Sequence, residues 1–375
     1  MTGGGRHYLD HASTSPCRPA GVQALAAWLG AGGDPGRIHA EGHAARVAVE
    51  VAREQVASLL GARPREVIFT SGGTEAVVTA TWMATERGDH VVVPTVEHSS
   101  VLAASARHRV REVGVDHRGR VDPDGVMAAV TPATALVHLQ WGNHEVGTLQ
   151  PVAEVVAACR ERGVLTHVDA CAAAGHVPVD FRGLGADLLS VSAHKLGGPA
   201  GVGALCVRRG LRLRPLLVGG DQERARRAGY ENVPAIAGFG AVAEYLAAGA
   251  LSEEADRARA QTARVVGAVA EGRLGPGTEV LGDPHDRLPH LVCLGVAGVE
   301  AEPVLLGVDR AGVAVHSGSS CSSESLEPSP VLEAMGLDAS RSLRVSVGWS
   351  TTDADVEAFL AALPPVLDHL RALRT

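Results

Sequence analysis

The sequence is poor in aromatic residues and lacks the features that mark several classes of protein. Phe, Trp and Tyr make up 3% of its 375 residues, so its core must be built from Ala, Val and Leu. No apolar run approaches the roughly 18–20 residues that cross a bilayer. The opening, MTGGGRHYLD, has no apolar stretch typical of a signal peptide. These absences predict a cytoplasmic protein, and a composition of 46% hydrophobic and 20% charged residues indicates a globular one.

The charge balance and the cysteines exclude further classes. The 34 Lys and Arg are outnumbered by 42 Asp and Glu, and a net charge of −8 argues against direct nucleic-acid binding, which usually needs a basic field. The cysteines show no CxxC pair and no zinc-ligand spacing, so no metal site is predicted. In a reducing compartment they are expected to be free thiols, most of them buried. They are Cys17, Cys159, Cys171, Cys206, Cys293 and Cys321.

Short β-branched runs alternate with helical stretches through the first two-thirds of the chain. Strands are expected at 66–70, 90–94, 135–141, 164–169, 187–192 and 203–209, and helices at 74–88 and 151–163. This alternation predicts an α/β fold with a mostly parallel central sheet and helices on both faces. After about residue 250, helices near 252–272, 301–311 and 353–373 and strands near 290–296 and 342–348 predict a smaller α+β domain.

Two turns after predicted strands have the residues of a ligand site. In FTSGGTEA (69–76) small residues separate a strand from a helix, so backbone amides and the helix dipole could bind an anion. A βα turn with a Ser or Thr cap is the ordinary alternative. GFGAVA (238–243) nominally fits a dinucleotide fingerprint, but PAIA before it is not a convincing strand.

Three ionisable residues also follow predicted strands. In SVSAHKLGGPAGVG (190–203), Lys195 lies at the carboxyl end of a strand, where α/β proteins place their ligands, and a partly desolvated lysine there can form a Schiff base. Asp169 ends another strand and could pair with a protonated ring nitrogen, although it could also cap a helix. His98 follows a third strand, where a lone His is more often structural. Together with a turn that could bind a phosphate, these three residues match the groups that bind pyridoxal 5′-phosphate (PLP).

With these motifs in place, the sequence resembles the cysteine desulfurases of the class V aminotransferase superfamily over nearly its whole length. The matching stretches are YLDHAST (8–14), GDPGRIHAEG (33–42), FTSGGTEA (69–76), EHSS (97–100), NHEVGTLQP (143–151), HVDA (167–170), SVSAHKLGGP (190–199), GGDQERARRAGYEN (219–232), SGSSCSSESLEPS (317–329) and LRVSVG (343–348). The resemblance implies a PLP-dependent transferase of fold type I. It predicts a large PLP-binding domain over 15–250, with 1–14 and 251–375 forming the small domain.

The resemblance also implies roles for individual residues. Lys195 would form a Schiff base with PLP, Asp169 would pair with its ring nitrogen, and His98 would stack on the ring and relay protons. Arg344 would bind the substrate carboxylate. The phosphate would be held by the backbone at Gly73 and by Thr74, Ser192 and His194.

Cys321, in the run SGSSCSS (317–323), would be the nucleophile that takes sulfur from bound cysteine. A loop of Ser and Gly can move the thiol between substrate and acceptor, and function is often found on such loops. The spacing CSSESLEPSPVLEAMGL after this cysteine is similar to the long-loop group of the family. An inert buried thiol is the alternative reading.

Three positions depart from the family pattern. His144 replaces the second Asn of an Asn-Asn-Glu run, Ala172 replaces a Gln, and Tyr230 replaces a Thr that crosses from the partner subunit to the phosphate. Imidazole and phenol can still donate hydrogen bonds to the cofactor, but alanine cannot. Each lost neutral hydrogen bond is worth about 1 kcal/mol, so PLP binding should survive.

The function that follows is conversion of L-cysteine to L-alanine with a persulfide formed on Cys321. A selenocysteine lyase, a C–S lyase or an aminotransferase of the same fold remains an alternative, as does a non-catalytic relative that binds a sulfur-transfer partner. Expected partners are L-cysteine, a sulfur-acceptor protein or biosynthetic sulfur carrier, and a second copy in a homodimer. No membrane partner is expected.

Overall fold

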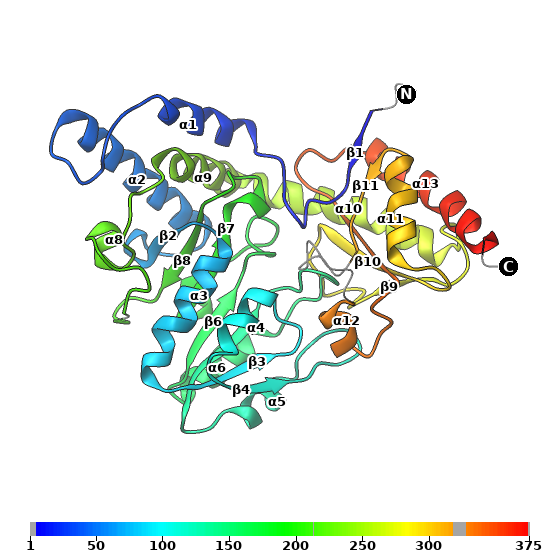
Figure 1. Ribbon diagram of the computed structural model, residues 1–375, viewed down its shortest axis with the longest axis horizontal. Coiled ribbons are helices and arrows are strands. Elements are labelled where there is room, and N and C mark those ends of the chain that lie inside the picture. The colour runs from blue at the N-terminus through cyan, green and yellow to red at the C-terminus, as the bar shows by residue number, and fades with distance from the viewer. Residues whose placement is uncertain (1–4, 213, 318–327, 374–375) are drawn as a thin grey trace.

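The computed structural model describes residues 5–212, 214–317 and 328–373 (Figure 1). Cys321 therefore lies outside the described residues. The strands are β1 (His7–Tyr8), β2 (Val67–Thr70), β3 (His90–Pro94), β4 (Arg109–Val113), β5 (Thr134–Gln140), β6 (Leu165–Asp169), β7 (Leu188–Ser192), β8 (Gly203–Val207), β9 (Thr278–Leu281), β10 (Leu291–Val296), β11 (Val313–Ala314) and β12 (Ser342–Ser346).

The α-helices are α1 (Pro19–Leu29), α2 (Ala40–Leu59), α3 (Gly73–Ala84), α4 (Ser99–Ser105), α5 (Pro123–Ala129), α6 (Val152–Glu161), α7 (Phe181–Leu184), α8 (Gln222–Ala225), α9 (Val233–Tyr245), α10 (Leu251–Ala270), α11 (Ala301–Arg310), α12 (Pro330–Ala334) and α13 (Asp353–Ala372). Short helical turns are η1 (Pro64–Glu66), η2 (Thr85–Arg87), η3 (Ala193–Leu196) and η4 (Leu246–Ala250).

A seven-stranded sheet with the order β2-β8-β7-β6-β5-β3-β4 forms the larger half of the molecule. β8 runs antiparallel to both of its neighbours, and the pairings from β7 through β4 are parallel. The predicted fold class, a mostly parallel sheet covered by helices, is therefore confirmed. Within it, the register places Gln140 beside Asp169, and Asp169 beside Ser190, so the carboxyl ends of β5, β6 and β7 meet at one edge.

Strand alternation divides the buried side chains between the two faces of this sheet. Ile68, Leu136 and Leu188 pack with α3 and α4, whereas Phe69, Val137 and Leu189 pack with α2, α5, α6 and α9. Asp169 has the same parity as Leu165, which belongs to the α3 face. The residues that end the strands on this face are thus directed toward the beginning of α3.

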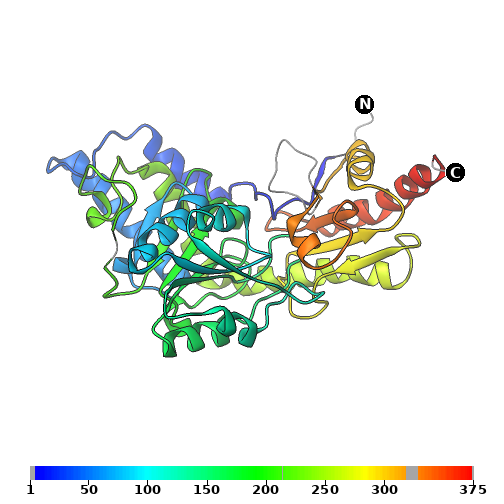
Figure 2. The ribbon, with the colours of Figure 1, turned by 60° about the horizontal axis from the view of Figure 1, so that its bottom comes forward.

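The smaller half of the molecule is built around the antiparallel sheet β12-β10-β9 (right side of Figure 1; Figure 2). Its buried side chains come from α10, α11, α13 and the strands, and Leu9 from the N-terminal segment joins them. β1 pairs in parallel with β11, which brings the N-terminal segment beside the C-terminal part of the chain. The domain boundaries given above remain a prediction.

The two halves are joined by a long helical path, Val233–Ala270, which by length and composition alone could cross a membrane. Core helices of soluble proteins pass the same test. Here α9 packs against α1 and α2, and Gly249 interrupts the helical geometry with φ 118°. GFGAVA (238–243) lies inside α9, so it is not a strand-to-helix turn. This agrees with the absence of a convincing strand before it in the sequence.

Candidate active site

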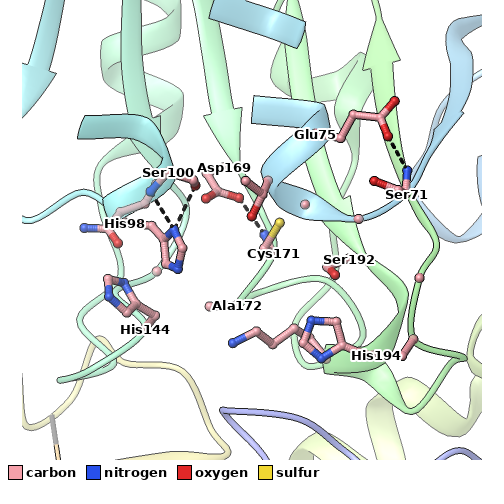
Figure 3. Close-up of a pocket in the computed structure, with 18 residues that line it drawn as sticks. Ser71, Glu75, His98, Ser100, His144, Asp169, Cys171, Ala172, Ser192 and His194 are labelled. Atoms are coloured by element: carbon pink, nitrogen blue, oxygen red, sulfur yellow. Dashed lines mark hydrogen bonds between the residues drawn. The ribbon is translucent and has the colours of Figure 1, made fainter. Parts of the chain in front are cut away.

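A cavity of about 400 Å³ lies where the carboxyl ends of β5, β6 and β7 meet the beginning of α3 (Figure 3). It brings together most of the predicted site residues. Its lining consists of Ser71, Gly72, Gly73, Thr74, Glu75, His98, Ser100, Gln140, Gly142, His144, Asp169, Cys171, Ala172, Ser192, His194, Lys195, Ala200 and Gly201.

The turn from β2 into α3 presents backbone amides to this cavity. Gly72 is the N-cap of α3 and supplies no side-chain hydrogen bond, so the first amides of the helix are left for a ligand. A Cβ added at Gly73 would lie 2.6 Å from the Cys171 sulfur, so a larger residue there would force the Cys171 side chain to shift. The site therefore combines a helix N-terminus with close backbone access, a suitable arrangement for an anion.

Glu75 lies in this first turn, but its negative charge is compensated. Arg227 donates from Nε to Oε1 at 2.8 Å and from a terminal nitrogen to Oε2 at 3.1 Å, and the Ser71 amide donates to Oε2 at 2.8 Å. Burial opposes ionisation of Glu75, but the hydrogen bonds from Arg227 and Ser71 outweigh it and lower the pKa of the carboxyl. The Glu75–Arg227 pair thus fixes the turn without opposing an anionic ligand.

Asp169 is held as a carboxylate at the floor of the cavity. Its Oδ1 accepts the Ser190 hydroxyl at 2.8 Å and the Cys171 amide at 3.0 Å. Burial tends to raise the pKa of Asp169, but His167 and the Cys171 amide are among the groups that bring it below its usual value. Among the described residues nothing donates to Oδ2, which is left for a ligand such as a protonated ring nitrogen.

Behind Asp169 lies a buried pair of histidines on the same face of the sheet. The Nδ1 atoms of His138 and His167 are 2.8 Å apart, so one of them donates to the other. Thr81 donates its hydroxyl to the Val77 carbonyl at 2.9 Å and can accept from Nε2 of His138 at 3.3 Å. Burial lowers the pKa of His167 to about 4. The pair is therefore neutral at physiological pH.

Glu97 is a second buried carboxyl close to Asp169, and its pKa is shifted in the opposite direction. Its Oε1 accepts the Gln140 amide at 2.6 Å, but Oε2 has no hydrogen-bond partner among the described residues. Burial, reinforced by the charge of Asp169, raises the pKa of Glu97 to about 8. At neutral pH Glu97 is therefore protonated, and the negative charge near the cavity floor belongs to Asp169.

His98 and His144 approach each other on one wall of the cavity (Figure 3). Their rings meet edge to face with centroids 5.1 Å apart. His98 is the N-cap of α4, and its Nδ1 accepts the Ser100 amide at 3.1 Å. In the neutral ring the proton is then on Nε2. Nε2 of His144 lies 3.6 Å from Oε1 of Glu145, close enough for an ion pair if the ring is protonated.

Lys195 and His194 lie on the turn η3, directly after β7. The Lys195 ammonium donates to the Ala12 carbonyl at 2.5 Å, and Nδ1 of His194 is 3.1 Å from the Thr14 hydroxyl. Burial, with the neighbouring Lys195 charge, lowers the pKa of His194 to about 4. The N-terminal segment thus contacts the turn that carries Lys195, and His194 meets a ligand as a neutral group.

Arg344, predicted to bind the substrate carboxylate, is fully buried on β12 and does not line the cavity. One terminal nitrogen donates to the His144 carbonyl at 2.9 Å, and the other donates to Asp10 at 3.0 Å and Ser13 at 2.7 Å. Its guanidinium therefore joins the His144 loop to the N-terminal segment. Its role toward substrate remains a prediction.

Tyr230 lies outside this cavity within the single chain. It is 64% exposed, and its hydroxyl donates to the Gly33 carbonyl at 2.9 Å. The predicted contact with phosphate would be made across a dimer, so the single chain leaves it as a prediction. Ala172 lines the cavity and offers no polar side-chain atom, as expected from the sequence.

Comparisons with known proteins agree with this geometry. The family model "Aminotransferase class-V" matches residues 7–359. The chain belongs to the class V aminotransferase family.

Among curated relatives, a cysteine desulfurase of Gluconacetobacter diazotrophicus is 42% identical over 98% of this chain and 94% of its own length. Among solved structures, a NifS-like protein superposes with a TM-score of 0.90 at 30% identity, covering 97% of this chain and all of that one. The structure "SspA in complex with cysteine" superposes with a TM-score of 0.81 at 26% identity, covering 92% of this chain and all of that one. Cysteine desulfurase is the activity that these comparisons support.

PLP is the cofactor of this class V aminotransferase, and the donor set fits it. The first turn of α3 with Thr74, Ser192 and His194 suits the phosphate, and Asp169 offers a buried anionic oxygen for the ring nitrogen. Lys195 supplies the amine that binds an aldehyde. The close approach at Gly73, where a Cβ would not fit, is the shape that a phosphate against backbone amides requires.

Several residues of the site were not predicted. Glu97 and Gln140 form the buried contact beside Asp169, Ser100 orients His98, and Arg227 neutralises Glu75. Gln140 ends β5 on the edge where Asp169 ends β6, so its position at a strand end was a usable signal. Nothing in the sequence around Arg227 indicates a partner 152 residues away.

Proposed function

We propose that this chain removes sulfur from L-cysteine, releases L-alanine and carries the sulfur as a persulfide on Cys321. The stoichiometry balances, because the substrate C–S bond breaks, an S–S bond forms on the thiol, and a proton takes the place of sulfur on carbon. When bound, PLP supplies an aldehyde for the amino group and a conjugated ring that withdraws electrons from the substrate. The single observation that carries the proposal is the placement of Lys195 and Asp169 in one cavity.

The residues of the chain divide the remaining work. Asp169 stays ionised and would keep a ring nitrogen protonated, while Glu97 stays neutral and does not compete for that proton. The first turn of α3 would hold the phosphate. His98 lines the cavity with its Nδ1 held by the Ser100 amide, which leaves Nε2 as the ring nitrogen that exchanges a proton with a ligand, and His144 faces it from the same wall. Support for cysteine as substrate comes from the related structure solved with cysteine.

An assay of the purified protein with L-cysteine tests this function. The absorption spectrum, alanine and sulfide are followed together in wild type and in Cys321→Ser. We expect wild type to absorb in the near-visible range and to form alanine, and Cys321→Ser to keep the absorption but lose alanine formation. Full alanine formation by Cys321→Ser would favour a C–S lyase or an aminotransferase instead. A protein that stays colourless after reconstitution with PLP would exclude the desulfurase as well as the C–S lyase and the aminotransferase.

The later fate of the sulfur and the assembly are part of the same proposal. A persulfide must pass to an acceptor protein or a biosynthetic sulfur carrier, and we expect a cytoplasmic homodimer in which Tyr230 approaches the partner's phosphate site. Two apolar side chains, Val218 and Ile38, are also exposed in the single chain, which supports the expectation that a second subunit covers part of its surface. Light scattering of the PLP-bound protein measures the mass, and a monomer would contradict the dimer.

A further inference from the structure

A second cavity, with a volume of about 580 Å³, lies at the opposite edge of the seven-stranded sheet from the PLP site. It is lined by Leu165 at the start of β6 and by Asp187 just before β7, whereas the PLP site takes Asp169 and Ser192 from the other ends of these strands. A five-residue strand separates the two sites by about 13 Å. The second cavity is therefore distinct from the catalytic one.

Arginine dominates the lining of this cavity. Six arginines face two carboxylates there, a formal excess of four positive charges in a chain whose net charge is −8. The arginines come from segments far apart in the sequence, which the sheet edge brings together. They are Arg63, Arg87, Arg160, Arg182, Arg208 and Arg209.

The two carboxylates of this cavity, Glu66 and Asp187, already accept hydrogen bonds from other groups of the chain. Glu66, which is 5% exposed, accepts the Arg63 backbone amide on Oε2 at 2.8 Å and the Arg209 backbone amide on Oε1 at 3.1 Å. Asp187 accepts Nε of Arg208 on Oδ1 at 2.7 Å and the Thr166 amide on Oδ2 at 2.9 Å. All four carboxylate oxygens thus serve to fix the strand edge and its loops.

Among the described residues, only the Arg208 guanidinium of this set forms an ion pair. Within residues 5–212, 214–317 and 328–373, no carboxylate forms an ion pair with any of the other five guanidiniums. Like charges gathered around one hollow repel each other, and an anion bound between them removes that repulsion. The guanidinium fork also matches the oxygens of phosphate with two parallel hydrogen bonds.

We propose that this arginine-lined cavity binds a small anion that carries a diphosphate or triphosphate chain. Its volume lies within the range of small-molecule sites, roughly 300–1,000 Å³. The number of unpaired guanidiniums exceeds what a single phosphate or carboxylate can use, so a chain of phosphates suits it better. A concave site with a buried apolar floor of Val164, Phe181 and Ala186 favours a small ligand over the surface of an acidic protein.

Calorimetric titration of the PLP-bound protein with inorganic pyrophosphate and with ATP, at low salt and without divalent cations, tests the proposal. Bound PLP fills the other phosphate site, so it does not contribute to the signal. We expect saturable binding of one anion per chain. Removing two guanidiniums in Arg182→Gln/Arg209→Gln should raise the Kd at least about tenfold, since charge-assisted hydrogen bonds are lost. Equal affinity for the two anions would assign recognition to the phosphate chain, and tighter ATP binding would add a nucleoside contact.

The matched control is Arg111→Gln/Arg310→Gln, which removes the same charge from two exposed arginines elsewhere, on β4 and α11. It should leave the Kd within about twofold, and both double variants should keep the PLP absorption and the rate of alanine formation. Absence of binding to wild type overturns the proposal, as does an equal loss in the two double variants. Binding that is seen only after PLP is removed also overturns it, because the anion then occupies the cofactor site.

Discussion

Replacing Glu97 by Gln should remove one pH-dependent contribution to stability and leave the packing unchanged. Glutamine has the shape of the protonated acid that Glu97 adopts, and its Oε1 can still accept the Gln140 amide that lies 2.6 Å away. In wild type, Oε2 of Glu97 has no described hydrogen-bond partner. Ionisation of that buried oxygen is unfavourable, which is why the pKa of Glu97 rises to about 8 from its ordinary value of 4.5.

The sign and size of the effect follow from proton linkage. Because the folded state binds the Glu97 proton more tightly than the unfolded state, the free energy of unfolding falls as pH rises from about 4.5 to 8. Each pH unit is worth about 1.4 kcal/mol, or about 2 kcal/mol between pH 6.5 and 8. Buried histidines such as His167, whose pKa is lowered to about 4, add stability as pH rises toward 6.5 and change little above it. The interval from pH 6.5 to 8 therefore isolates Glu97.

Urea unfolding of the PLP-free protein, followed by circular dichroism at several pH values, measures this effect. The stability of Glu97→Gln relative to wild type should increase by about 2 kcal/mol from pH 6.5 to 8. Glu86→Gln, a change at an exposed carboxylate on η2, is the matched control, and its effect on the free energy of unfolding should stay within about 0.5 kcal/mol. A constant difference for Glu97→Gln, or one that declines with pH, would refute the assignment of a neutral Glu97.

Three further substitutions test the cavity itself. In Gly73→Ala the new Cβ meets the Cys171 sulfur at 2.6 Å, so the Kd for PLP should rise at least about tenfold by fluorescence titration. Gly267→Ala, on α10 outside the cavity, adds a Cβ that meets nothing within 4 Å and should bind PLP normally, and equal Kd values for the two variants would contradict the argument. His144→Asn should change the Kd for PLP by less than about tenfold, because one neutral hydrogen bond is worth about 1 kcal/mol; a loss of PLP binding would assign His144 a larger part. Arg344→Lys should raise the KM for L-cysteine about tenfold or more with retained PLP absorption, since a lysine cannot replace the planar fork; an unchanged KM would argue against a contact with substrate.

The strand ends were predictable because a parallel sheet gathers them at one edge. Asp169 ends β6 and Lys195 follows β7, as the β-branched runs indicated, and the structure places both residues in one cavity. β4 was not predicted, because this edge strand is charged and largely exposed at Arg109 and Arg111 and so lacks the apolar pattern of the others. The helix α9 was not predicted either. Its small apolar residues are buried on nearly all sides, so they do not form the one-sided apolar stripe of a surface helix.

Contacts between segments far apart in the sequence could not be predicted from sequence patterns. The Lys195 ammonium meets the Ala12 carbonyl 183 residues away, and Arg344 reaches Asp10 across 334 residues. Neither pair has a local spacing that marks it. The arginine-lined cavity has the same origin, because Arg63 and Arg209 are brought together only by the antiparallel pairing of β2 with β8.

The number of donors that each buried carboxyl receives decides the charge of the active site. Asp169 and Glu97 are both surrounded by protein, and burial alone would raise the pKa of each. Asp169 receives a hydroxyl and an amide hydrogen bond on one oxygen, and its pKa lies below its usual value, so it stays ionised. Glu97 receives a single amide, and the ionised Asp169 opposes a second charge, so it keeps its proton. Adding one donor near Oε2 of Glu97 would therefore favour a second negative charge close to Asp169, and the site would then hold two carboxylates instead of one.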